Sequence, residues 1–206
     1  MALEPSDKRA VAFIDGQNLY HAVRAAFGCA HPNYDAKALA EAVCRSKGWR
    51  LVQTRFYTGI PAPTENPFWH HYWTGKLGVM VRQGVHAFSR SLQYLRRRIR
   101  LPDGSEYSFM DGEEKGIDVR IAIDVIRAAH RSECDVVLLF SQDQDLSEVA
   151  DEIRAISREQ GRWLKIASAY PLSRTSRNCR GINKTDWVPI EREMYDACLD
   201  RRDYRA

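Results

Sequence analysis

The sequence lacks the features that mark secreted, zinc-binding and membrane-spanning proteins. It holds only five cysteines, and no two of them form a Cys-x-x-Cys pair. Disulfide frameworks and zinc knuckles need paired, closely spaced cysteines, so we exclude both and expect thiols in a reducing compartment. Apolar runs are short, such as Val136–Phe140, whereas a membrane span needs roughly 20 residues. Residues 1–9 contain no apolar core of a secretory signal, so we expect a cytoplasmic location.

A strong excess of one charge is also missing. The 206 residues include 31 Lys and Arg against 27 Asp and Glu, a net charge of +4. So small a positive surplus does not indicate a class of binding partner. The positions of the charges along the chain are therefore more informative than their sum. With 44% hydrophobic and 28% charged residues the chain has the balance of a folded protein. Its length predicts a single domain over 1–206, with a core at about 10–200 and a basic hairpin inserted at about 90–110.

Apolar runs typical of strands alternate with helical apolar stripes along the chain. We expect strands at 9–15, 50–57, 85–88, 135–141, 163–169 and 187–190. We expect helices at 19–27, 35–48, 68–73, 115–130 and 146–159, and a last helix that ends near 199. The inserted hairpin would pair 94–101 with 105–110 around a Pro-Asp-Gly turn. This alternation predicts an α/β fold, a three-layer sandwich with a mainly parallel central sheet and helices on both faces.

Four aspartates follow or precede the predicted central strands. Asp15 ends the first strand, Asp143 and Asp145 follow the strand at 135–141, and Asp118 opens the preceding helix. Ligands of parallel sheets bind outside the carboxyl ends of the strands, so we expect these acids in one crevice. Bare carboxylates would repel one another, and oxygen ligands without His or Cys favour Mg²⁺ or Mn²⁺ over zinc. A cation held in this way is suited to phosphodiester hydrolysis.

Each acid also has a purely structural interpretation. Asp145, with Glu148 three residues later, matches a capping box, and Asp118 could complement the dipole of its helix. Asp15 could belong to a plain turn before Gly16. The metal-site hypothesis is favoured because all four acids fall where a parallel sheet places its ligand.

Three segments of the sequence resemble the signatures of a known family. They are Phe13–Leu19 (FIDGQNL), Glu114–Val119 (EKGIDV) and Ser141–Leu146 (SQDQDL). In this order they resemble the motifs of the NYN domain, in the LabA-like branch of the PIN-like ribonuclease superfamily. The resemblance extends from about Val11 to the C-terminal helix. It implies a PIN-like fold and a Mg²⁺- or Mn²⁺-dependent endoribonuclease that leaves 5′-phosphate and 3′-hydroxyl ends on RNA.

The resemblance also implies roles for individual residues. The catalytic and metal-binding acids would be Asp15, Asp118, Asp143 and Asp145. Substrate contacts or orientation would come from Asn18, Lys115 and Ser141. The sequence departs from the family at Gln142, where glycine is usual, and at Leu146, where an aromatic residue is usual. A side chain at Gln142 could crowd a tight turn.

Two other aspartates have weaker links to the family. Asp124 resembles an acid that is common in the family helix, but Arg120 and Arg127 stand at pairing distance along that helix, so we interpret Asp124 as structural or supporting. Asp186 resembles a late family acid that could support the site from the last strand, or it could be a simple turn acid.

Basic residues form two groups that could contact nucleic acid. One group lies on the predicted hairpin, at Arg96, Arg97, Arg98 and Arg100. The other follows the fifth predicted strand and supplies the candidate substrate contacts Arg174, Arg177, Arg180 and Lys184. Such groups neutralise phosphates, but on a hairpin they could equally be a charged, solvated edge. The aromatic and histidine residues between 69 and 73 are expected to pack in the core.

The leading hypothesis is therefore a metal-dependent endoribonuclease with RNA as its partner. Water bound to Mg²⁺ or Mn²⁺ and positioned by Asp143 or Asp145 would attack the phosphodiester, with Asp15 and Asp118 holding the metal. A non-catalytic RNA-binding or regulatory module that retains the fold is the alternative, and phosphatase chemistry on a small substrate is a third hypothesis. No membrane partner is expected, and a homo-oligomer stays open.

Overall fold

The computed structural model describes residues 2–174 and 178–204, which form an α/β sandwich around one parallel sheet. The strands of this sheet stand in the order β3-β2-β1-β6-β7-β8, and every neighbouring pair is parallel. The strands are β1 (Arg9–Asp15), β2 (Arg50–Ile60), β3 (His86–Ser91), β6 (Val136–Phe140), β7 (Lys165–Pro171) and β8 (Asp186–Ile190). The helices are α1 (Gly16–Phe27), α2 (Ala36–Ser46), α3 (Pro67–Arg82), α4 (Ile117–His130), α5 (Ser147–Glu159) and α6 (Arg192–Asp196). The predicted fold class is confirmed.

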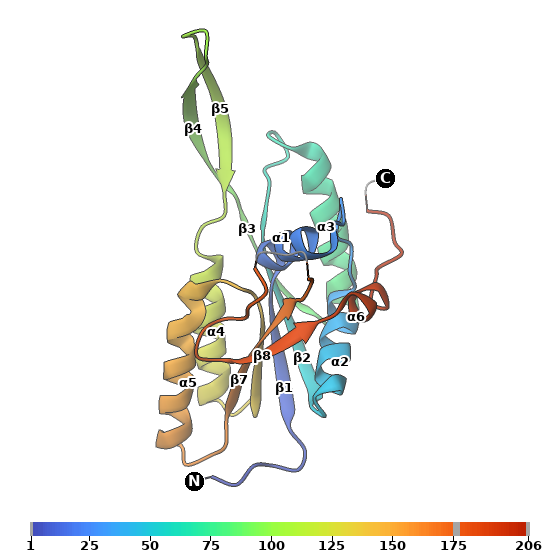
Figure 1. Cartoon of the computed structure of the whole chain (residues 1–206), viewed down its shortest axis with the longest axis vertical. Coiled ribbons are helices and arrows are strands. Elements are labelled where there is room, and N and C mark those ends of the chain that lie inside the picture. The colour runs from blue at the N-terminus through green and yellow to red at the C-terminus, as the bar shows by residue number, and fades with distance from the viewer. Residues whose placement is uncertain (1, 175–177, 205–206) are drawn as a thin grey trace.

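Two hydrophobic clusters separate the layers, one on each face of the sheet. Alternate β1 side chains point to opposite faces, with Ala12 and Ile14 on one side and Val11 and Phe13 on the other. The first face is covered by α1, α2, α3 and α6, and the second by α4 and α5 (Figure 1). Burial on both faces explains why the central strands are nearly continuous apolar runs.

The order of the strands reverses between β1 and β6. In open α/β sheets, this switch point leaves a crevice at the carboxyl ends of the two strands. The chain turns sharply here, because α1 begins at Gly16 directly after Asp15. A Cβ at Gly16 would lie 2.6 Å from the Phe56 ring and 2.9 Å from the backbone oxygen of Tyr57, so only glycine fits. The fold therefore places Asp15 at the mouth of the crevice.

A two-stranded hairpin of β4 (Gln93–Arg100) and β5 (Glu106–Glu113) projects from the carboxyl edge of the sheet (Figure 1). Its base is attached by two hydrogen bonds, from Leu92 N to the Ile60 oxygen and from Ala62 N to the Tyr94 hydroxyl, each 3.0 Å long. The hairpin then returns the chain to the start of α4.

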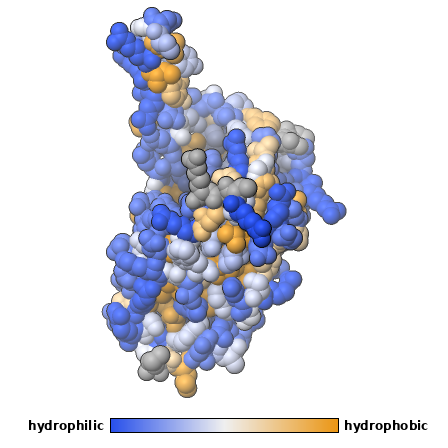
Figure 2. Space-filling model, in the orientation of Figure 1, coloured by the Kyte–Doolittle hydropathy of each residue, from blue (hydrophilic) through white to orange (hydrophobic). Residues whose placement is uncertain are grey.

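Directly opposed residues of the hairpin share a face, so its two faces differ in character. One face carries the exposed apolar residues Leu95, Ile99 and Tyr107, with Arg97 bonded to Asp111 and Glu113. The other face carries the arginines of β4 at 96, 98 and 100, which form no ion pair within residues 2–174 and 178–204. Hydrophilic and hydrophobic residues accordingly lie side by side on the projecting arm in Figure 2.

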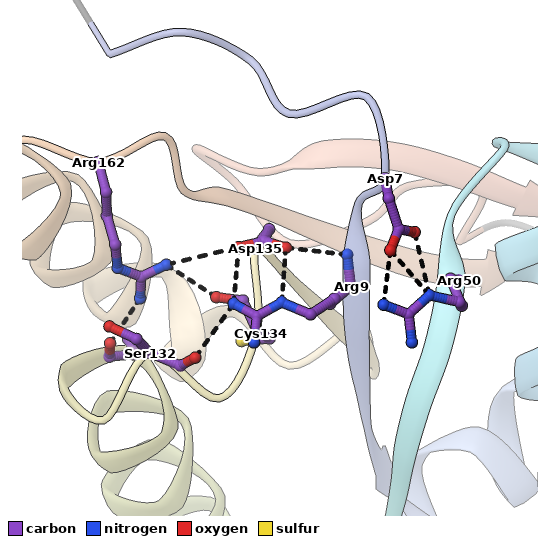
Figure 3. Close-up of polar contacts among 8 residues, drawn as sticks. Asp7, Arg9, Arg50, Ser132, Cys134, Asp135 and Arg162 are labelled. Carbon is purple, nitrogen blue, oxygen red and sulfur yellow. Dashed lines mark hydrogen bonds and ion pairs between the residues drawn. The ribbon is translucent and has the colours of Figure 1, made fainter.

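At the opposite edge, a polar network ties β1 to the start of β6 (Figure 3). The Asp135 carboxylate accepts hydrogen bonds of 3.0 Å from the backbone N–H, Nε and a terminal nitrogen of Arg9. Arg162 adds a guanidinium 3.9 Å away and bonds the Cys134 backbone oxygen. Burial raises the pKa of Asp135, but the bonds from Arg9 outweigh burial, so the pKa lies below its ordinary value.

We expect Asp135→Ala to lower the free energy of unfolding by about 2 kcal/mol, because charged hydrogen bonds are lost and Arg9 is left without its carboxylate. Urea denaturation at pH 7 measures this change. The difference should shrink in acid, since a lowered carboxyl pKa gives stability that disappears as pH falls through the folded-state value. Asp7→Ala, which breaks only the exposed Asp7–Arg50 pair, is the matched control. Equal losses in both variants would contradict the prediction.

The part of the chain that the structure describes contains no helix that is both long and apolar enough to cross a membrane.

Candidate functional site

Asp15 is the innermost acid at the switch point. Its side chain is only 6% exposed and caps α1 by accepting a 3.0 Å bond from Asn18 N–H. Burial raises its pKa to about 6, and the charges of Asp143 and Asp118 add to the rise. The bonds from the Asn18 N–H and the Ser141 hydroxyl oppose it without cancelling it. Asp118 and Asp143 are therefore close enough for their charges to act on Asp15.

Glu114 is a fourth acid that sequence reasoning missed. Its carboxylate accepts a hydrogen bond from the backbone N–H of Gly59, at the end of β2. Burial, together with the charges of Asp15 and Asp118, raises the pKa of Glu114 to about 7, against the opposing effect of the Gly59 bond. Glu114 opens the EKGIDV segment four residues before Asp118, so the signal was present in the motif itself. We name Asp15, Glu114, Asp118 and Asp143 the acidic cluster.

Asp143 and Asp145 lie in the turn after β6. Asp143 N–H donates to the Ser141 hydroxyl at 3.1 Å, and an Asp143 carboxylate oxygen accepts from Asp145 N–H at 3.0 Å. Ser141 is buried, whereas Asp145 is exposed. The charges that raise the pKa of Asp15 come from Asp143 and Asp118, and Asp145 is not among them. Asp145 is thus linked to the acidic cluster by its backbone rather than by its charge.

The acidic cluster matches a hard divalent cation in its type of ligand. Its potential ligands are carboxylate oxygens, and two of its members have pKa values raised by burial and by their neighbours' charges. A cation would remove this repulsion. Across residues 2–174 and 178–204, however, no three His, Cys, Asp or Glu side chains lie close enough together to hold a metal ion. The chemistry of the acids thus fits a metal more closely than their present spacing does.

Asn18 joins the two central strands at their carboxyl ends. Its Oδ1 atom accepts a 2.9 Å hydrogen bond from Gln142 N–H, across the switch point. The Gln142 side chain faces the other way and donates to the Arg180 and Asn178 backbone oxygens at 2.7 and 3.2 Å. Gln144 donates to the Gly181 oxygen at 3.2 Å in the same manner. Glutamine at position 142, where glycine is usual in the family, therefore holds the segment that follows β7.

The predicted basic contacts occupy several different places. Lys115 is exposed and pairs with Glu113 at 2.8 Å, near the acidic cluster. Lys184 pairs with Asp151 at 2.6 Å and Glu148 at 3.2 Å, so its ammonium group faces α5. Arg174 and Arg180 are exposed on the segment after β7. Arg177 lies outside the described residues.

The two remaining aspartates have structural partners. Asp124 is buried and accepts from Tyr57 Oη at 3.1 Å and Arg120 Nε at 2.8 Å, which fits its structural interpretation. Asp186 begins β8 at its amino end and pairs with Lys165 at 2.6 Å. Because β8 runs parallel to β7, this end lies away from the crevice, and the suggestion that Asp186 supports the site is wrong.

Comparisons with known proteins identify the family of this chain. No curated protein matches the chain. A solved structure of a protein of unknown function from Vibrio parahaemolyticus has a TM-score of 0.50 and 19% identity, covering 93% of this chain and 98% of that one. The MurG structure from Acinetobacter baumannii has a TM-score of 0.31 and 12% identity, covering 88% of this chain and 45% of that one. The NYN domain model matches residues 9–179, which contain the whole acidic cluster. The chain therefore belongs to the NYN domain family, within the PIN-like superfamily.

Proposed function

We propose that this chain is a divalent-metal-dependent endoribonuclease that hydrolyses RNA phosphodiester bonds at the acidic cluster. The proposal rests on one observation above all. The switch point of a PIN-like fold gathers Asp15, Glu114, Asp118 and Asp143, and the pKa of Asp15 is raised to about 6 by burial and by its neighbours' charges. A soluble fold keeps such a costly arrangement most readily when a cation or a reaction uses it.

Some of the acids would bind the cation, and another would accept the proton of the attacking water. Asp15, Asp118 and the additional Glu114 would hold Mg²⁺ or Mn²⁺. Bound there, the ion would supply a polarised phosphate and a water of lowered pKa. Asp143, at the end of the opposite strand, would orient the attacking water and accept its proton, and Asp145 is the alternative for this role. Asn18 keeps the two strand ends together through its bond to Gln142 N–H.

RNA would approach from the basic side of the crevice. Ser141 and Lys115 are adjacent to the acids, and exposed arginines follow β7. The proposed substrate contacts remain Asn18, Lys115, Ser141, Arg174, Arg177, Arg180 and Lys184. A cytoplasmic location and LabA-like character are part of the proposal, supported by the cysteine spacing and the three motifs.

The test is cleavage of an end-labelled RNA of mixed sequence with Mn²⁺, with Mg²⁺ and with EDTA. We expect cleavage with a divalent ion and none with EDTA. At 100 times its Kd the ion should also stabilise the fold by about 2.7 kcal/mol, a rise of several degrees in Tm. Asp118→Asn should lose this shift, while Asp196→Asn on the exposed face of α6 should keep it.

Other outcomes favour the other hypotheses. RNA binding that weakens with salt, ignores EDTA and leads to no cleavage would replace the enzyme with a non-catalytic RNA-binding module. Hydrolysis of a chromogenic phosphomonoester without cleavage of RNA would indicate a phosphatase.

A further inference from the structure

A cavity of about 320 Å³ lies beside the acidic cluster, between α1, α3 and the base of the hairpin. Its walls include Tyr20, His21 and Arg24 from α1 and Trp69 from α3. The base of the hairpin closes the opposite side with Leu92. The volume falls at the small end of ligand pockets, which suits a single planar group better than a folded peptide.

The aromatic rings of the cavity are arranged around open space rather than stacked on one another. Tyr20 meets Trp69 edge-on, with ring centroids 6.4 Å apart and planes at 84°. Tyr20 also meets the His21 ring edge-on at 5.5 Å. Trp69 and Tyr20 are half-buried, whereas His21 and Arg24 are exposed. Ring faces of this kind can stack on a nucleobase, and the Arg24 guanidinium at the edge can neutralise a phosphate.

The cavity and the acidic cluster come close together at Gly59. A Cβ at this glycine would lie 3.1 Å from Gln17 Nε2, a cavity wall, and 2.7 Å from Glu114 Oε2, a member of the cluster. Gln17 also follows Asp15 by two residues on α1. A chain whose phosphate lay at the acids would therefore have a neighbouring base within reach of the cavity.

We propose that this cavity holds one unpaired nucleobase of the bound RNA, next to the phosphate at the acidic cluster. This inference rests on the proposed function, whose substrate it narrows to single-stranded RNA at that position. Trp69 stacks on the base, Tyr20 meets the edge of the base, and Arg24 contacts the adjoining phosphate. A base that stays paired in a duplex cannot enter the cavity. Its pairing partner and the two bases stacked on it would have to enter with it, and the cavity has room for a single planar group.

The experiment moves a single abasic nucleotide along a fluorescent single-stranded RNA of twelve nucleotides. Binding is measured by anisotropy with Mn²⁺, so that the phosphate is held at the acids, on RNA whose linkages are slowly hydrolysed phosphorothioates, so that no cleavage is needed. Stacking of one base on aromatic rings contributes about 1–3 kcal/mol, so we expect one abasic position to weaken binding by roughly 5- to 150-fold. Trp69→Ala should weaken binding of the intact RNA to a similar degree and remove the penalty of that abasic position. Trp69→Phe should restore both the binding of the intact RNA and the penalty of that abasic position.

Exposed residues give a second readout that does not depend on Trp69 and its packing. Arg24→Gln should weaken binding of the intact RNA and lower its salt dependence, whereas Arg158→Gln, at the far end of α5, should not. An unchanged abasic profile in a folded Trp69→Ala protein would overturn the proposal, as would a flat profile in the wild type. If the protein cleaves no RNA but one abasic position still weakens binding, the proposed nuclease activity is rejected and the base-binding cavity is supported. If the protein cleaves RNA but every abasic position binds equally well, the nuclease activity is supported and the base-binding cavity is rejected.

Discussion

Asp143→Asn is expected to lower the rate of RNA cleavage by roughly 10²–10⁴-fold, the usual contribution of a positioned general base. The substitution keeps the shape of the side chain and its bond from Asp145 N–H, so the turn after β6 should persist. What it removes is the negative charge that accepts a proton from water. The measurement is the single-turnover rate of cleavage at saturating Mn²⁺, with enzyme in excess over labelled RNA.

Two comparisons make this prediction specific. Asp196→Asn changes an aspartate of α6 that pairs with Arg192 in a surface ion pair, and this variant should cleave RNA like the wild type. Asp145→Asn tests the alternative, since a greater loss there than in Asp143→Asn would exchange the roles of the two acids. If Asp143→Asn cleaves RNA at the wild-type rate, Asp143 takes no part in the reaction and the prediction is wrong.

Asp15→Asn is expected to make the fold more stable at pH 8, although the same change should abolish metal binding. Raising the pKa of a carboxyl from 3.8 to about 6 costs the folded state about 3 kcal/mol once the group is ionised, since one pKa unit equals about 1.4 kcal/mol. Asparagine caps helices as well as aspartate does, so the bond from Asn18 N–H should survive. The gain at pH 8 should approach this cost.

The pH dependence gives the sign of the effect. Between pH 3.8 and about 6 the folded state binds more protons at Asp15 than the unfolded state, so wild-type stability falls as pH rises through this window. Glu114, with its pKa at about 7, acts in the same direction at slightly higher pH. Urea denaturation from pH 4 to pH 8 should thus show the two proteins diverging as pH increases. A variant that is less stable at pH 8, or a difference independent of pH, would contradict the prediction.

The sequence predicts the position of the crevice because that position depends on local patterns. Asp15 ends an apolar strand just before a glycine turn, and the turn with Asp143 follows another such strand. The parallel-sheet rule then brings both ends together without any knowledge of side-chain contacts. The short α6 and the longer α3 differ from prediction, since the ends of amphipathic helices depend on tertiary packing.

Residues whose roles depend on long-range contacts were not predictable in the same way. Glu114 lies in the EKGIDV motif, but its hydrogen bond from the Gly59 N–H, 55 positions earlier in the chain, is a contact that only the folded chain forms. Asp186 stayed open between a supporting acid and a turn acid, because its place depends on the parallel pairing of β8 with β7, which puts the amino end of β8 away from the crevice. Trp73 packs against Phe56 as predicted, but both Trp73 and Trp69 also line a cavity whose far wall is the base of the folded hairpin.

The projecting hairpin carries the arginines of β4 farther from the acidic cluster than the screening length of the solvent. From the start of β4 to Arg100 is about 24 Å at the usual rise of a strand, against a Debye length of about 8 Å at physiological ionic strength. At that distance the charge of the acidic cluster does not reach the end of the arm, where Arg98 and Arg100 stand beside the acids Asp103 and Glu106. Contacts of RNA phosphates with the arginines of β4 would weaken with salt and be unaffected by chelators, whereas binding at the acidic cluster would depend on the divalent cation.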